Sequence, residues 1–211
     1  LNFLEKFTCP EIAYAVHQCA RFVENPTKFY GEAVKRIGRY LLNSPDKGII
    51  LKPSSTESFD CWVDASHAGK WRKNGADTEK DATTAKSRTG YVLLYAGCPI
   101  IWASKLQTEI ALSSTEAEYI ALSTAMGEVI PLLHLMKEAQ EQGLPINVKN
   151  SAIHCKIFED NSGALEMARA PKMRPRTKHI NIKYHHFLER VISGLLSLYA
   201  VSTDEQIADI F

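Results

Sequence analysis

The longest regular pattern of hydrophobic and polar residues lies near the middle of the chain, at residues 113–136. Serine and threonine followed by acidic residues are typical of a helix N-terminus, so we predict a helix capped by Ser114 or Thr115. Glu116 and Glu118 lie about 200° apart around such a helix, and therefore only one of them can face a given site. We favour Glu118, because a continuous apolar stripe begins there. The stripe consists of Leu122, Ala125, Val129, Leu132 and Met136.

Residues 1–52 show the same helical period in two shorter stretches, and Asn25-Pro26-Thr27 stops the first and caps the second. Residues 53–56 are rich in proline and serine, which is typical of a linker. We therefore predict a small helical segment over residues 1–55 and a second domain over residues 56–211. The two apolar stripes consist of Ile12, Ala15, Val16, Cys19, Phe22 and Val23, and of Val34, Ile37 and Leu41.

After the linker the pattern becomes typical of strands. Five short apolar runs are separated by turn residues, and Gly97-Cys98 joins two of them in a hairpin. Three helices are predicted after the fourth run. The first follows that run directly, the second covers residues 181–191, and the third begins after a cap at Thr203 or Asp204. This order predicts an α/β fold, a five-stranded mixed sheet of three antiparallel strands and then parallel additions, flanked by helices. The predicted strands are 59–65, 90–96, 99–103, 152–159 and 195–201.

Composition narrows the class of protein. The chain has 211 residues, 45% of them hydrophobic, which suffices for a sizeable core in one or two domains. Five cysteines are scattered without a CxxC pair, which favours buried free thiols in a reducing compartment over zinc sites or disulfides. We expect neither a membrane span nor a signal peptide, because no apolar run approaches spanning length and none opens the chain.

A local charge bias is hidden by the net charge of +1. Residues 169–183 contain several basic residues and no acidic one. Such a stretch is typical of a surface that faces phosphates, and a solvated basic loop explains it equally well. Its basic residues are Arg169, Lys172, Arg174, Arg176, Lys178 and Lys183.

Four acidic residues stand at the ends of predicted elements: Asp64, Glu118, Asp160 and Asp209. Taken singly, each is more simply a turn, cap or helix-dipole residue. If the four meet at one edge of a sheet, they repel one another unless cations hold them together. Mg²⁺ is the natural partner, since it takes oxygen ligands from a few carboxylates plus a substrate phosphate.

The order of these acids on this framework resembles the ribonuclease H fold. The strings WVDAS, SSTEAEY, FEDNSGAL, RTKHINIKYHHFLE and DEQIADIF are similar to the ribonuclease H domain of copia-type LTR retrotransposon polyproteins. The leading segment, residues 9–51, is similar to the end of the reverse transcriptase that precedes that domain. The resemblance covers nearly the whole chain.

The resemblance implies a nuclease that cuts the RNA strand of an RNA–DNA hybrid during reverse transcription. It implies that Asp64, Glu118, Asp160 and Asp209 are catalytic and bind two Mg²⁺ or Mn²⁺ ions, which activate water and stabilise the leaving oxygen. The implied partners are the hybrid and the reverse transcriptase part of the same polyprotein. The implied place of action is the cytoplasm, within the virus-like particle of a retroelement, or the nucleus. The residues expected to contact the nucleic acid are Asn161, Ser162, Arg174, Arg176 and Lys178.

Two alternatives stay open. An integrase-like strand transferase uses the same fold, but it has fewer acids and places its glutamate on a late helix. A catalytically silent retroelement remnant, recruited for nucleic-acid binding or structure, would bind hybrids whether or not the acids were present. Glu116 also matches the SSTEAEY string, and only the helical-face argument and the residues that follow favour Glu118.

Overall fold

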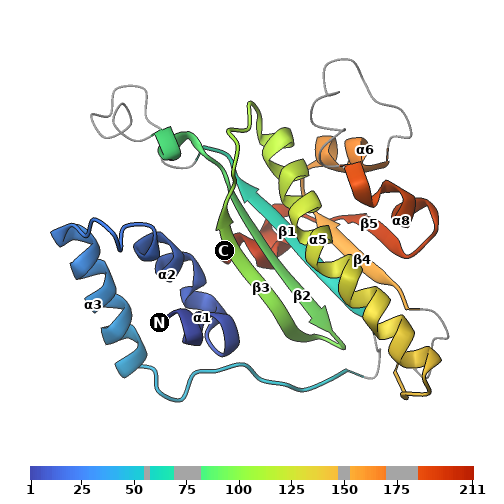
Figure 1. Cartoon of the computed structure of the whole chain (residues 1–211), viewed down its shortest axis with the longest axis horizontal. Helices are drawn as coiled ribbons and strands as arrows, with labels where there is room; N and C mark the ends of the chain where they lie inside the picture. The colour runs from blue at the N-terminus through green and yellow to red at the C-terminus, as the bar shows by residue number, and fades with distance from the viewer. Residues whose placement is uncertain (55–57, 69–81, 147–152, 170–184) are drawn as a thin grey trace.

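The fold is described from a computed structural model that covers residues 1–54, 58–68, 82–146, 153–169 and 185–211 (Figure 1). Its centre is a sheet with the strand order β3-β2-β1-β4-β5. β1 runs antiparallel to β2, β2 runs antiparallel to β3, and β4 runs parallel to both β1 and β5. This confirms the predicted α/β fold, with a five-stranded mixed sheet of three antiparallel strands followed by parallel additions. The strands are β1 Phe59–Ser66, β2 Arg88–Tyr95, β3 Cys98–Leu106, β4 Cys155–Glu159 and β5 Leu196–Ala200.

The hairpin turn lies one residue earlier than predicted. Cys98 already belongs to β3, and the two turn residues are Ala96 and Gly97, with φ angles of 51° and 78°. Positive φ at both central positions is the geometry of the tight turns that match the twist of paired strands. Glycine adopts it readily, whereas Ala96 does so against its preference.

One face of the sheet is covered by the long helix α5, Ser114–Glu141 (Figure 1). Its cap is Ser113, one residue before the predicted Ser114 or Thr115: the Ser113 hydroxyl accepts the N–H of Glu116 at 3.1 Å. Along the helix Leu133 is fully buried, whereas the predicted Leu132 and Met136 are only partly buried. The residues of α5 that fill the core include Ala117, Leu122, Ala125, Met126, Val129 and Leu133.

By length and composition, α5 could also cross a membrane, and it is the one such helix among the described residues. Half of its most apolar 18-residue window is buried inside the fold. The same composition is expected of a helix that is buried against a sheet. This apolar window differs from the expectation that no apolar run approaches spanning length.

The opposite face is covered by several short elements. Ala13 packs against Val92, Ala208 and Phe211. On the other half of this face, the ring of Phe158 stacks between Trp62 and Tyr199, with centroid distances of 4.3 and 5.7 Å. The N-terminal helices that lie next to β3 are α1 Asn2–Phe7, η1 Pro10–Ile12 and α2 Ala13–Ala20 (Figure 1).

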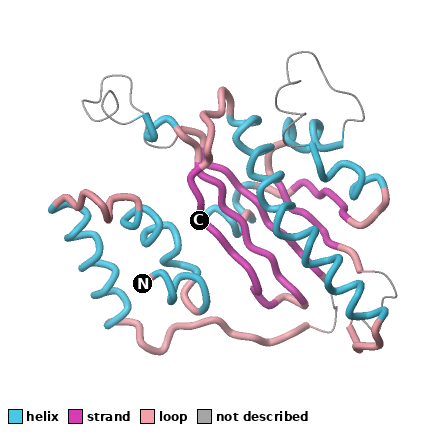
Figure 2. The backbone as a smooth tube through the Cα atoms, in the orientation of Figure 1, coloured by secondary structure: helices cyan, strands magenta, loops and turns pink. Residues whose placement is uncertain are grey.

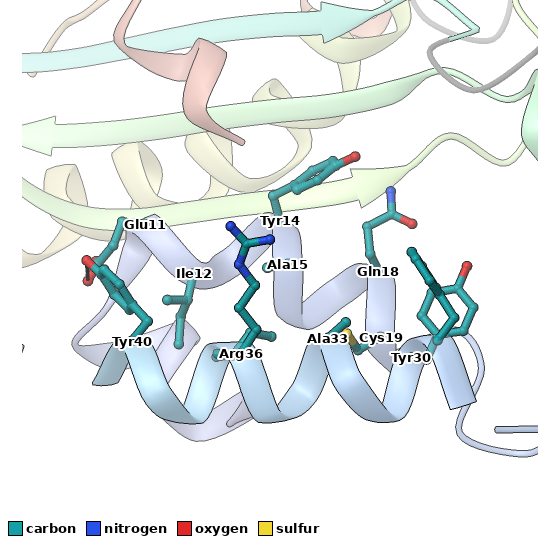
Figure 3. Close-up of a pocket in the computed structure, with 12 residues that line it drawn as sticks. Glu11, Ile12, Tyr14, Ala15, Gln18, Cys19, Tyr30, Ala33, Arg36 and Tyr40 are labelled. Atoms are coloured by element: carbon teal, nitrogen blue, oxygen red, sulfur yellow. Dashed lines mark hydrogen bonds between the residues drawn. The ribbon is translucent and has the colours of Figure 1, made fainter. Parts of the chain in front are cut away.

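A third helix, α3 Lys28–Leu42, packs on α2. The predicted pair of N-terminal helices is therefore confirmed. A cavity of about 470 Å³ lies between them, where Tyr40 donates a hydrogen bond to Glu11 (Figure 3). An extended loop then leads to the sheet (Figure 2), and the predicted boundary at residue 55 falls outside the described residues.

The predicted terminal helix is wrong. Two 3₁₀ turns, η5 Thr203–Glu205 and η6 Ile207–Ile210, take its place. Gln206 interrupts the helix because its backbone is extended and its side chain is buried. Its amide donates to the carbonyl of Val63 in β1 at 2.8 Å, and its side-chain oxygen accepts the N–H of Ala208.

Helices follow β4, as predicted. Ser162–Arg169 forms α6, and the described part of the predicted helix 181–191 consists of η4 His185–Phe187 followed by α8 Leu188–Ile192. α6 approaches α5 closely at Gly163, where an added Cβ would lie 2.9 Å from the hydroxyl of Thr115. This contact brings the start of α6 to the start of α5.

Candidate metal centre

Two neighbouring parallel strands bring two of the predicted acids together. Trp62 of β1 pairs with Phe158 of β4. Two residues further along each chain lie Asp64 and Asp160, so both carboxylates reach the same edge of the sheet. The hydroxyl of Thr203 donates to Asp160 at 2.7 Å and orients its carboxylate.

Glu118 is the third member of this group. It lies in the second turn of α5, is 6% exposed, and offers an oxygen to the same site as Asp64 and Asp160. One ligand oxygen from each of the three residues lies within 4.8 Å of the other two. Glu116 faces elsewhere and accepts the N–H of Leu112 at 2.9 Å, as part of the helix cap. The structure therefore agrees with the helical-face argument for Glu118.

The fourth predicted acid, Asp209, lies on η6 beside this group. Together with Asp64 it lines a cavity of about 200 Å³. Its negative charge contributes to the raised pKa of Asp64. It is not among the three carboxylates whose oxygens all lie within 4.8 Å of one another.

Burial and mutual repulsion make this group costly to ionise without a cation. Burial raises the pKa of Asp64 to about 6, and the charges of Asp160 and Asp209 add to the effect. Burial also raises the pKa of Glu118, followed by the charges of Glu159 and Asp64, while the N–H of Ala65 opposes the shift. One oxygen of Glu118 has no hydrogen-bond partner in the described residues.

These observations fit a divalent cation. Carboxylate oxygens are the ligands that Mg²⁺ and Mn²⁺ prefer, and a bound cation would satisfy the unpartnered oxygen and stabilise the ionised forms. The described residues Asp64, Glu118 and Asp160 can therefore hold a metal ion.

Sequence reasoning missed Glu159. Its side chain is fully buried, one oxygen accepts the N–H of Asn161 at 3.1 Å, and the other has no partner among the described residues. Burial raises its pKa to about 8. The signal was available in the sequence, because alternation along β4 places residue 159 on the same buried face as Cys155 and Ile157.

The predicted nucleic-acid contacts are described only in part. Asn161 caps α6 by accepting the N–H of Ala164 at 3.0 Å, and it also accepts the hydroxyl of Thr115. Ser162 is the exposed first residue of α6. The other three predicted contacts lie outside the described residues: Arg174, Arg176 and Lys178.

Comparison with known proteins gives a consistent set of relatives. No family model matches the chain. It is 36% identical over 203 residues to the retrovirus-related Pol polyprotein from transposon RE1 of Arabidopsis thaliana, covering 96% of this chain and 13% of the relative. It is 36% identical over 202 residues to the corresponding protein from transposon TNT 1-94 of Nicotiana tabacum, covering 96% and 14%.

Among solved structures, it is similar to LC11-RNase H1 in complex with an RNA/DNA hybrid. That alignment has 15% identity, covers 72% of this chain and 91% of the other, and has a TM-score of 0.42. The sequence matches, by contrast, extend over nearly the whole chain. Over 96% of its length the chain is similar to retrovirus-related Pol polyproteins of transposons, and it corresponds to about 13% of the length of these relatives.

Proposed function

We propose that this chain is the ribonuclease H part of a copia-type LTR retrotransposon polyprotein. In this role it hydrolyses the RNA strand of RNA–DNA hybrids during reverse transcription. The observation that carries the proposal is the group formed by Asp64, Glu118 and Asp160, whose oxygens lie within 4.8 Å at one edge of the sheet. The Pol polyprotein relatives support it, because reverse transcription generates such hybrids.

The four acids would hold two Mg²⁺ or Mn²⁺ ions. When bound, such ions lower the pKa of a coordinated water and stabilise the charge of the leaving oxygen in phosphodiester hydrolysis. The chain itself fixes the geometry: Ala65 donates to the Glu118 carboxylate, Thr203 orients Asp160, and Gln206 ties η6 to β1. These contacts hold the acids in place before substrate arrives, which lowers the reorganisation needed for catalysis.

The hybrid would be bound mainly through its backbone. We assign phosphate or ribose contacts to Ser162 and to the three basic residues Arg174, Arg176 and Lys178, with Asn161 shaping the start of α6. Recognition by backbone and groove shape is largely independent of base sequence, and binding weakens as salt rises.

Residues 1–55 would be the end of the reverse transcriptase of the same polyprotein. Large apolar side chains on this segment are exposed, among them Phe29 at 74% and Leu42 at 80%. The matched relatives are several times longer than this chain. The preceding polymerase part is therefore the proposed partner of this surface.

The proposal is tested by cleavage of a hybrid with a labelled RNA strand in Mg²⁺ or Mn²⁺. The unmodified chain should cut the RNA strand only, and Asp64→Asn and Glu118→Gln should each reduce the rate by at least about 100-fold. Glu116→Gln is the matched control, because Glu116 is two residues away but belongs to the helix cap. Hybrid binding without cleavage, unaffected by loss of Asp64 or Glu118, would instead favour the silent remnant.

A further inference from the structure

A small cavity adjoins the metal centre on the side of the N-terminal helices. It has a volume of about 200 Å³ and lies where α2, β1, β2 and η6 meet. Gly90 forms part of its wall, and an added Cβ there would lie 2.9 Å from the carbonyl oxygen of Ala208. The polar or charged residues that line the cavity are Tyr14, Asp64, Ser66, Arg88 and Asp209.

Arg88 is the unusual member of this set. It is 4% exposed, and its Nη1 lies 3.0 Å from Nδ1 of His17 and 3.1 Å from the hydroxyl of Ser104. The guanidinium carbon lies 4.9 Å from the centre of the Tyr14 ring. Its Nη2 is buried and has no hydrogen-bond partner among the described residues.

Arg88 is linked to Phe211 through Ser104, whose hydroxyl accepts from Arg88 and donates to the backbone oxygen of Phe211. In the described part of the chain Arg88 forms no ion pair, and its partners Ser104 and His17 are uncharged acceptors. His17 can accept the Arg88 N–H only while its Nδ1 carries no proton. An arginine keeps its charge when buried, so burial without an anionic partner is unfavourable.

The size and chemistry of the cavity indicate one small anion. Pockets for whole small molecules begin at about 300 Å³, so 200 Å³ suits a single phosphate group better than a nucleoside. The free Nη2 of Arg88 supplies a charged donor, and the hydroxyls of Tyr14 and Ser66 supply further donors.

We propose that this cavity binds one backbone phosphate of the nucleic acid beside the cleaved linkage, with Arg88 as the positioning residue. The inference rests on the proposed function, because it takes the substrate to be a hybrid held at Asp64. It gives the N-terminal helices a part in the site, since Tyr14 comes from α2. Asp64 and Asp209 line the same cavity and would repel a phosphate, so binding there should require a divalent cation.

The test measures hybrid binding by fluorescence anisotropy at several salt concentrations, in a Glu118→Gln background that separates binding from cleavage. Arg88→Gln should weaken binding roughly tenfold in Mg²⁺ and lower the salt slope by about one. Arg39→Gln is the matched control: it removes an exposed charge from α3 and does not line the cavity, so the slope should not change.

Two further variants guard against loss of folding in Arg88→Gln. Arg88→Lys keeps the charge but loses the planar fork, and Tyr14→Phe keeps the ring over Arg88 but removes the hydroxyl. Both should raise KM for hybrid cleavage in the unmodified background, with kcat changed less. Unchanged KM in folded Arg88→Lys and Tyr14→Phe, together with an unchanged salt slope in folded Arg88→Gln, would overturn the phosphate site and leave Arg88 with a structural role.

The outcomes separate this inference from the proposed function. An Arg88-dependent salt slope in a chain that never cuts hybrids would support the phosphate site while contradicting the nuclease proposal. Cleavage that depends on Asp64 but not on Arg88 would support the nuclease proposal and contradict the phosphate site.

Discussion

The two faces of the sheet are covered in different ways. On one face α5, with α6 and η4 beside it, fills a continuous apolar core with residues such as Leu122 and Met126, both fully buried. On the other face, short pieces from both ends of the chain meet around Ala13 and Phe211, joined by polar contacts such as that of Gln206. The first face supplies stability, and the second carries Asp209 and the proposed phosphate site. The metal centre therefore depends on two kinds of packing at once.

The largest expected effect on stability comes from removing a buried side chain of α5 from the core. Leu122→Ala should lower the free energy of unfolding by about 2–5 kcal/mol, because it leaves a cavity in a close-packed region. Urea denaturation measures the change. Leu135→Ala, at a position of the same helix that is 60% exposed, should change it by less than about 0.5 kcal/mol. Equal effects at the two positions would contradict the assignment of the core to this face.

A smaller effect on stability is expected from adding a methyl group to Gly90, on the face of the sheet that η6 covers. Gly90→Ala would place a Cβ 2.9 Å from Ala208 and from Phe211, so η6 must shift. We expect a loss of about 1–3 kcal/mol in stability and a further loss of hybrid cleavage, because η6 carries Asp209.

Thermal unfolding and cleavage assays together measure the effect of Gly90→Ala. Gly127→Ala is the matched control: it lies in α5 with nothing within 4 Å of an added Cβ, and it should stabilise the chain by up to about 1 kcal/mol. If Gly90→Ala left cleavage intact, the position of η6 would not matter for the site.

The smallest effect concerns pH and the docking of α2. Burial and the charge of Arg88 lower the pKa of His17 from 6.5 to about 4. Between these values the unfolded chain binds a proton that the folded chain excludes, so stability falls as pH drops from 6.5 towards 4. Since His17 is only half-buried, we expect less than about 1 kcal/mol.

The indole N–H of Trp102 donates to the carbonyl of Glu5 in α1, which contacts α2, so its NMR signal reports the docking of the N-terminal helices on β3. Titration from pH 7 to pH 4 should shift its signal as α2 loosens. His17→Gln, which cannot take up the proton, should show a weaker pH dependence. The same titration in both proteins would exclude His17 as the cause.

Much of the site could be predicted because it depends on local geometry. The 200° separation of Glu116 and Glu118 follows from the helical period alone, and the structure brings Glu118 to Asp64 and Asp160. The mixed sheet, with three antiparallel strands followed by parallel additions, followed from the strand pattern and the resemblance together.

Other features could not be predicted because they depend on contacts between distant residues. The prediction of a terminal helix was wrong because the side-chain amide of Gln206 donates a hydrogen bond to the carbonyl of Val63, 143 positions away. The hairpin turn lies one residue earlier than predicted because Ala96 adopts a positive φ, which alanine does not favour. The role of Arg88 depends on its contacts with His17 and Tyr14 of α2, and His17 lies 71 positions earlier in the chain.

The hydrogen bond between Gln206 and Val63 makes the last turns of the described chain part of the folding unit of the sheet. It joins residues 143 positions apart, so it forms only when both segments are in place. Because domains generally fold as units, η6 with Asp209 should become ordered together with β1 and not independently of it. Local unfolding of η6 would then remove one wall of the cavity beside Asp64.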